Sequence, residues 1–229
     1  MTEQPDNWWY SPQCTLLFAD VALEHCAHHG ITPSGDIQKA IGEGRAGAIF
    51  ALGLADALSA ETWMRLVHPR EGAPDIRVMY MDNTGPKGSN KMNVLEVEVT
   101  TYTKDSTDSL GDFLFRTKLD PSKHAYSAST VIVGFVQRGC EPTEITAAHE
   151  GLERRGARGL CYLVGRLGGA HYQVVQVLPN LRGAQNIDLD RAFTSHQSAV
   201  AEVSRGMSST TTVSETPIPT ANPFLPSTK

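Results

Sequence analysis

The stretch that decides the fold is residues 75–103, DIRVMYMDNTGPKGSNKMNVLEVEVTTYT. Apolar and polar residues alternate in two runs, 76–81 and 92–103, which are rich in Val, Thr and Tyr and are typical of strands. Between these runs, residues 83–91 contain the Gly, Pro and Asn of a turn. The pattern therefore predicts two antiparallel strands joined by a hairpin loop.

Acidic side chains on this hairpin predict a metal site. Glu96 and Glu98 share one face of the second strand, about 6 to 7 Å apart, because side chains alternate along a strand. A turn centred between Pro86 and Lys87 puts Asp75 across from Glu98, within a residue or two. Carboxylates that converge repel one another unless a cation neutralises them, and oxygen ligands suit Mg²⁺ or Mn²⁺. A solvated face of an amphipathic hairpin explains the same pattern without a metal.

The rest of the chain alternates between helical and strand patterns. Helices are predicted at 15–29, 37–58, 62–67, 108–119, 143–155 and 188–203, and further strands at 129–139, 159–167 and 171–178. The short helix at 62–67 rests on a predicted N-cap in residues 59–62. This order predicts a mixed α/β fold in which helices flank a small sheet.

We expect one domain over residues 1–207. It contains an acidic N-terminal helical segment, 1–36, and a core that carries the hairpin, 37–137. Residues 208–229 include 14 Ser, Thr or Pro among 22 positions, a composition that cannot bury enough apolar surface to fold. They are predicted to form a disordered tail.

Pro74-Asp75, followed 20 residues later by Glu96-Val97-Glu98, resembles the motif of the PD-(D/E)xK nuclease superfamily. The predicted order over about residues 37–137, a helix, the hairpin, a helix and a further strand, also resembles the core of that superfamily. The resemblance implies a restriction-endonuclease-like fold and metal-dependent hydrolysis of phosphodiester bonds. It implies that Asp75 and Glu96 hold the ion and that Glu98 is a catalytic residue.

The motif departs from the family pattern at Glu98. The family has a Lys there, which helps to place and activate the attacking water, although a minority of restriction endonucleases resemble this chain in having Glu. Either Glu98 accepts the proton of a metal-bound water, or the site is inactive and only binds. Lys87, Lys91 or Gln137 are candidates for the missing group.

The charge distribution leaves room for a nucleic-acid partner. The formal charge is −5, and the whole excess lies in the first 38 residues, where five acidic residues meet no Lys or Arg. Residues 154–187 contain five Arg and no acidic residue. Arg suits phosphate, but cations also favour exposed helix ends. The predicted DNA contacts are Arg154, Arg155, Arg158, Lys87 and Lys91.

Simpler features of the sequence predict the cell location of the protein and its functional class. The chain has no run of about 18 apolar residues, no basic start typical of a signal peptide, and four scattered cysteines. We therefore expect a cytoplasmic protein that does not enter membranes. The preferred hypothesis is a Mg²⁺-dependent (or Mn²⁺-dependent) deoxyribonuclease, such as a restriction or phage-defence enzyme, and a homodimer if it cuts both strands. The alternative is a catalytically inactive α/β protein that binds nucleic acid or protein.

Overall fold

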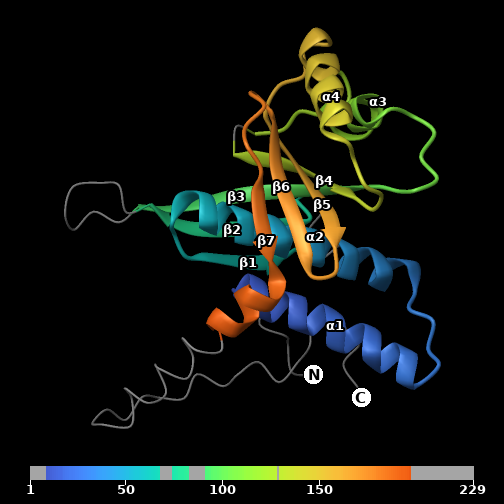
Figure 1. The fold of residues 1–229 in the computed structure, drawn as a ribbon, viewed down its shortest axis with the longest axis vertical. Helices are drawn as coiled ribbons and strands as arrows, with labels where there is room; N and C mark the ends of the chain where they lie inside the picture. Colours follow the sequence, from blue (N-terminus) through green and yellow to red (C-terminus); the bar gives the residue numbers. More distant parts are fainter. Residues whose placement is uncertain (1–8, 68–73, 83–90, 128, 197–229) are drawn as a thin grey trace.

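The computed structural model describes residues 9–67, 74–82, 91–127 and 129–196, and their fold is mixed α/β, as predicted (Figure 1). The helices are α1 (Pro12–His28), α2 (Gly35–Leu58), α3 (Leu110–Leu114) and α4 (Pro142–Arg154), and α3 continues into a π-helical segment, η2 (Phe115–Leu119). The strands are β1 (Thr62–Leu66), β2 (Ile76–Asp82), β3 (Lys91–Tyr102), β4 (Thr130–Val136), β5 (Leu160–Gly168), β6 (His171–Leu178) and β7 (Gln185–Asp188).

The seven strands of the described residues form one sheet in the order β1-β2-β3-β4-β5-β6-β7. The pairs β3/β4 and β4/β5 are parallel, and the other neighbours are antiparallel. A parallel pair needs a crossover connection, and helices provide it here: α3 and η2 lead from β3 to β4, and α4 leads from β4 to β5.

Helix α2 occupies the centre of the molecule. It contacts all seven strands, and α1 packs along it as well (Figure 1). A helix surrounded in this way is apolar on most sides, which explains the sequence AGAIFALGLADAL at residues 46–58. The largest fully buried side chains of this core include Phe50, Ile49, Met64, Ile76 and Val97.

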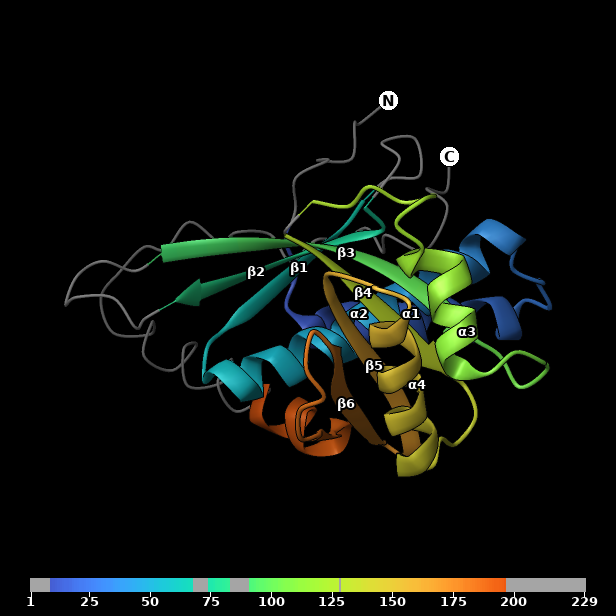
Figure 2. The same ribbon diagram turned by 90° about the horizontal axis from the view of Figure 1, so that it is seen from above.

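The other face of the sheet is covered by α3 and α4, which pack against each other (Figure 2). A second apolar cluster lies beneath them and includes Tyr102, Leu114 and Leu152. The sheet therefore has helices on both faces, as predicted, and β3 contributes residues to both clusters.

The predicted helix at 62–67 is wrong, because these residues form β1. Ser59 does not start a helix. It ends α2 in a left-handed conformation, with a φ of 49°. Thr62 then pairs with Tyr80 of β2, and Tyr10 pairs with Met64 on the open side of the strand. Partners on both sides outweigh the weak local preference of so short a segment.

The structure also differs from the prediction in the C-terminal part of the chain. Strand β7 was not predicted, and it has only four residues. The predicted helix at 188–203 is present over 189–196. Residues 197–203 and the predicted tail, 208–229, lie outside the described residues.

The hairpin has the register that the position of its loop predicts. Ile76 pairs with Val97 in the antiparallel ladder of β2 and β3. The same register, continued by one residue, puts Asp75 opposite Glu98. The placement of these two carboxylates on neighbouring chain segments is thus confirmed.

Candidate functional site

Asp75 lies immediately before β2, where the ladder to β3 ends. Its Oδ2 accepts a hydrogen bond of 2.8 Å from the main-chain N–H of Val99, two residues beyond the last paired residue, Val97. The carboxylate therefore replaces the carbonyl that a longer β2 would offer to β3. The main-chain oxygen of Asp75 accepts a bond from Val67, which fixes the residue from the other side.

Glu98 is the most deeply buried acidic residue of the site, with an exposed fraction of 5%. Its Oε2 accepts a hydrogen bond of 2.5 Å from Nζ of Lys118. Its Oε1 is buried and has no hydrogen-bond partner within the part of the chain that the structure describes. A buried carboxylate oxygen without a partner is costly, so this atom marks a place where a further positive or proton-donating group would be stabilising.

Lys118 reaches Glu98 from η2. Leu110, Leu114 and Lys118 follow one another at intervals of four residues and so lie near one face of the helical segment. Leu110 and Leu114 are buried, and the Lys118 side chain is 21% exposed. π-helical turns are frequent at functional sites. Sequence analysis missed Lys118, although a lysine that continues an apolar stripe was a usable signal.

Helix α2 approaches β2 most closely beside Asp75. A Cβ atom on Gly47 would lie 2.2 Å from Cδ1 of Ile76, so only glycine fits here without a shift of the isoleucine. Glu43 precedes Gly47 by one helical turn and therefore lies on the same side of α2. The close approach brings Glu43 towards the start of β2.

The surroundings of Glu43 raise its pKa. Burial and then the negative charge of Asp75 raise the pKa of Glu43, while Lys39 and Lys118 act in the opposite direction. Lys39 forms an ion pair of 3.4 Å with Glu43. Sequence analysis missed Glu43 too, because nothing local links it to Asp75. We call Glu43, Asp75, Glu98 and Lys118 the carboxylate site.

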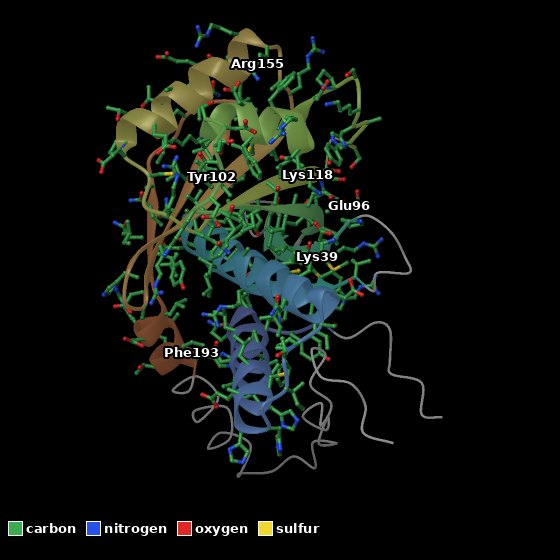
Figure 3. The ribbon with its side chains drawn as sticks, turned by 90° about the vertical axis from the view of Figure 1, so that its right-hand side faces the viewer. Lys39, Glu96, Tyr102, Lys118, Arg155 and Phe193 are labelled. Carbon is green, nitrogen blue, oxygen red and sulfur yellow. The ribbon has the colours of Figure 1, made fainter. Side chains whose placement is uncertain are left out.

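Glu96 has different surroundings. Its Oε2 accepts hydrogen bonds from the hydroxyls of Ser127, at 3.2 Å, and Thr130, at 3.5 Å. Among the described residues, no three His, Cys, Asp or Glu side chains stand close enough to hold a metal ion together. Asp75, Glu96 and Glu98 thus do not form the three-carboxylate cluster expected from the sequence. Figure 3 shows Glu96, Lys118 and Lys39 towards the same edge of the molecule.

The predicted phosphate contacts Arg154, Arg155 and Arg158 lie at the end of α4 and in the segment that follows it. Arg155 forms an ion pair with Asp112 and lies over the ring of Phe115, 5.2 Å from its centre (Figure 3). Arg154 donates a hydrogen bond to the main-chain oxygen of Glu150, and Arg158 is exposed.

Three residues were candidates for the role of the lysine that the family has in place of Glu98. Lys91 is exposed at the start of β3, five residues before Glu96. Gln137 follows the far end of β4 and is exposed. Lys87 lies outside the described residues. The structure brings Lys118 to the site instead of Lys91 or Gln137.

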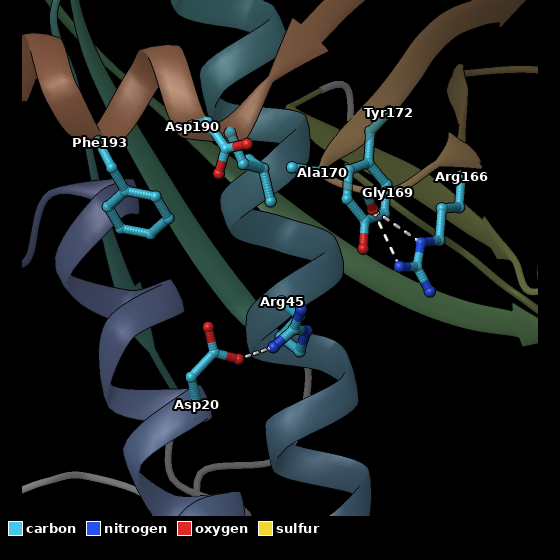
Figure 4. A pocket seen from close by; sticks show the side chains of 9 residues that line it. Asp20, Arg45, Arg166, Gly169, Ala170, Tyr172, Asp190 and Phe193 are labelled. Carbon is cyan, nitrogen blue, oxygen red and sulfur yellow. Dashed lines mark hydrogen bonds and ion pairs between the residues drawn. The ribbon is translucent and has the colours of Figure 1, made fainter.

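A separate cavity of about 300 Å³ lies between α1, α2 and the turn after β5 (Figure 4). Arg45 and Arg166 line it, together with Asp20, Tyr172, Asp190 and Phe193. Arg45 is paired with Asp20, and Arg166 donates two hydrogen bonds to the main-chain oxygen of Gly169. Because both guanidinium groups are engaged, the carboxylate site is the stronger candidate.

No family model, curated protein or solved structure matches this chain. Across the described ranges, no helix has the length and apolar character needed to cross a bilayer.

Proposed function

We propose that this protein is a divalent-metal-dependent nuclease with a restriction-endonuclease-like core, and that the carboxylate site is its catalytic centre. The observation that carries the proposal is the buried, unpartnered Oε1 of Glu98, next to the position of Asp75. The element order supports it, because a helix (α2), the β2–β3 hairpin, a helix (α3) and a further strand (β4) occur in the expected order, with β1 inserted between α2 and the hairpin.

The residues at this place fit a hard cation. Carboxylate oxygens are the ligands that Mg²⁺ and Mn²⁺ prefer, and Glu98 Oε1 offers one that the protein leaves unpaired. We propose that Asp75 and Glu98 hold the ion. Glu96, the ligand expected from the sequence, is the weaker candidate because neither of its carboxylate oxygens is buried without a partner, as Oε1 of Glu98 is.

The chemistry is then shared among the remaining groups. A bound divalent ion supplies a Lewis acid that lowers the pKa of water and polarises a phosphoryl oxygen. Lys118, oriented by Glu98, replaces the lysine that the family motif places on β3 and stabilises negative charge that develops on the phosphate. Glu43 has a raised pKa and lies beside Asp75, which makes it the candidate acceptor for the proton of the attacking water.

Substrate and setting are part of the same proposal. The expected substrate is DNA, and cleavage of both strands would require a homodimer. Cys14, Cys26, Cys140 and Cys161 are all free, which is the usual state in a reducing cytoplasm.

The decisive experiment is incubation of the purified protein with plasmid DNA and Mg²⁺ or Mn²⁺. We expect cleavage, a loss of at least about 100-fold in rate for Glu98→Gln, and a loss within about 10-fold for the matched variant Glu96→Gln. Thermal melts of both variants check that they are folded. A larger loss for Glu96→Gln than for Glu98→Gln would show that Glu96, the ligand expected from the sequence, holds the metal instead of Glu98.

The second candidate function is a catalytically inactive module that binds nucleic acid or protein. The ion pair between Lys118 and Glu98 favours it, because it neutralises the buried carboxylate without a metal. Absence of cleavage with either cation, together with no heat of Mn²⁺ binding in a calorimetric titration, would support this function and reject the nuclease.

A further inference from the structure

Two aromatic rings form a parallel stack in the loop between η2 and β4, and the ring of Tyr126 is the exposed one. The ring centres of His124 and Tyr126 are 5.5 Å apart, and the ring planes differ by only 6°. Tyr126 is 36% exposed, which is a large fraction for an aromatic side chain that is already stacked. The loop therefore presents a flat aromatic surface to solvent.

This surface borders the carboxylate site. Burial, followed by the charges of Glu98 and Asp75, raises the pKa of Tyr126 to about 12, so the phenol lies within electrostatic reach of both carboxylates. A direct contact agrees with this placement, because the next residue, Ser127, donates a hydrogen bond to Glu96 on β3.

The loop that carries the rings is held at both ends. At its start, Asp120 accepts hydrogen bonds from the main-chain N–H and the hydroxyl of Ser122, at 3.0 and 2.6 Å. The main-chain oxygen of Asp120 also accepts the N–H of Lys123 and of His124. At the other end, Ser127 shares hydrogen bonds with two hydroxyl groups, those of Ser129 and Thr130. The stack is thus preformed beside the site.

We propose that the His124–Tyr126 stack is a platform for an unpaired nucleobase, and that the preferred substrate is single-stranded nucleic acid. In a duplex, each base face is covered by its neighbours, so a fixed aromatic surface next to the phosphate-cleaving groups suits an unstacked base. The phosphate part of this inference rests on the proposed nuclease function, and the stacking part does not.

Binding can be measured without cleavage. The probe is a fluorescein-labelled 12-nucleotide oligo-dT, followed by anisotropy in EDTA and again in Ca²⁺. We expect Tyr126→Ala to weaken binding between about 5-fold and 150-fold, and Tyr126→Phe to stay within about 3-fold, because the ring supplies the stacking. Leu167→Ala, at an exposed apolar residue near the end of β5, is the matched control and should bind as the wild type does.

Two further arms define the substrate. A blunt duplex of 12 base pairs should bind at least about 10-fold more weakly than the single strand, and oligo-rU compared with oligo-dT identifies the sugar that is accepted. The inference is overturned if Tyr126→Ala binds as tightly as the wild type, or if the duplex binds as well as the single strand.

The outcomes separate this inference from the nuclease proposal. If the protein binds oligo-dT through Tyr126 but cuts no nucleic acid, the platform inference stands and the nuclease proposal is rejected. If the protein cuts plasmid DNA and the Tyr126 substitution does not change oligonucleotide binding, the nuclease proposal stands and the platform inference is rejected.

Discussion

Two charged regions of this molecule differ in how far their ion pairs are exposed to solvent. Where α3 meets α4 and the end of β4, Asp112 pairs with Arg155 and Glu144 pairs with Arg138, with side chains between 27% and 47% exposed. At the carboxylate site, the side chain of Glu98 is 7% exposed and that of its partner Lys118 is 21% exposed. Exposed pairs of the first kind contribute little to stability, since water screens them.

The contrast shows why burial, rather than the number of charges, points to function. Both regions attracted attention in the sequence, one for its Arg residues and one for its carboxylates. In the first region each charge has a partner of opposite sign, although Nε of Arg138 is also buried without a hydrogen-bond partner among the described residues. In the second, one buried carboxylate oxygen is left without a partner among the described residues. A fold that needed stability alone would be better served by an apolar residue at position 98.

The largest effect should come from breaking the buried pair. Lys118→Met removes the cation that compensates Glu98, and we expect the free energy of unfolding to fall by about 2 to 4 kcal/mol. Urea denaturation at pH 7 in EDTA measures this. The double variant Glu98→Gln with Lys118→Met should recover more than half of the loss, because no uncompensated charge remains. If the double variant is as unstable as Lys118→Met, the lysine acts through packing and not through its charge.

An intermediate effect is expected at Glu43, whose pKa is raised mainly by burial. The folded protein holds the Glu43 proton more tightly than the unfolded chain does, so the associated stability is present at low pH and is lost as pH rises through the folded pKa. Glu43→Gln cannot ionise. At pH 7 in EDTA it should therefore be more stable than the wild type by less than about 1 kcal/mol, since solvent screens part of the effect.

Thermal melts between pH 3.5 and 8 test the sign of the Glu43 effect. The two proteins should converge near pH 4, where the wild-type carboxyl is largely protonated in both states. A variant that is less stable than the wild type at pH 7 would show that the ion pair with Lys39 outweighs burial.

The smallest effect belongs to the exposed pair. Arg155→Ala should lower the Tm by no more than about 2 °C at 50 mM salt, and the difference should shrink at 1 M salt because ions screen exposed charges. Differential scanning calorimetry at the two salt concentrations measures both values. A loss as large as that of Lys118→Met would mean that exposure does not distinguish the two regions.

The hairpin was predictable because its signals are local. Alternation of apolar residues defines β2 and β3, and the Gly-Pro-Lys-Gly loop locates the turn, so the register that relates Ile76 to Val97 follows by counting. Strand β1 was not predictable in this way. Its five residues adopt a strand because β2 and Tyr10 pair with them, and no local pattern records those partners.

The candidate site was only half predictable for the same reason. Asp75 and Glu98 meet through strand pairing, which sequence spacing describes. Lys118 and Glu43 arrive on helices that pack on opposite faces of the sheet, and tertiary contacts alone decide which of their side chains turn inward. The role of Glu96 stays a prediction, since a spacing of two residues gives a shared face of the strand and does not by itself show a shared ion.

The arrangement of the sheet has a consequence for how the chain is made. The strands lie side by side in the order in which a ribosome releases them, and α2, which all of them contact, is synthesised before any of them. Each new strand therefore emerges beside a neighbour that is already present and onto a helix that can cover it. The residues of the carboxylate site all lie between positions 43 and 118, so we expect its groups to be assembled when about half of the protein has been translated.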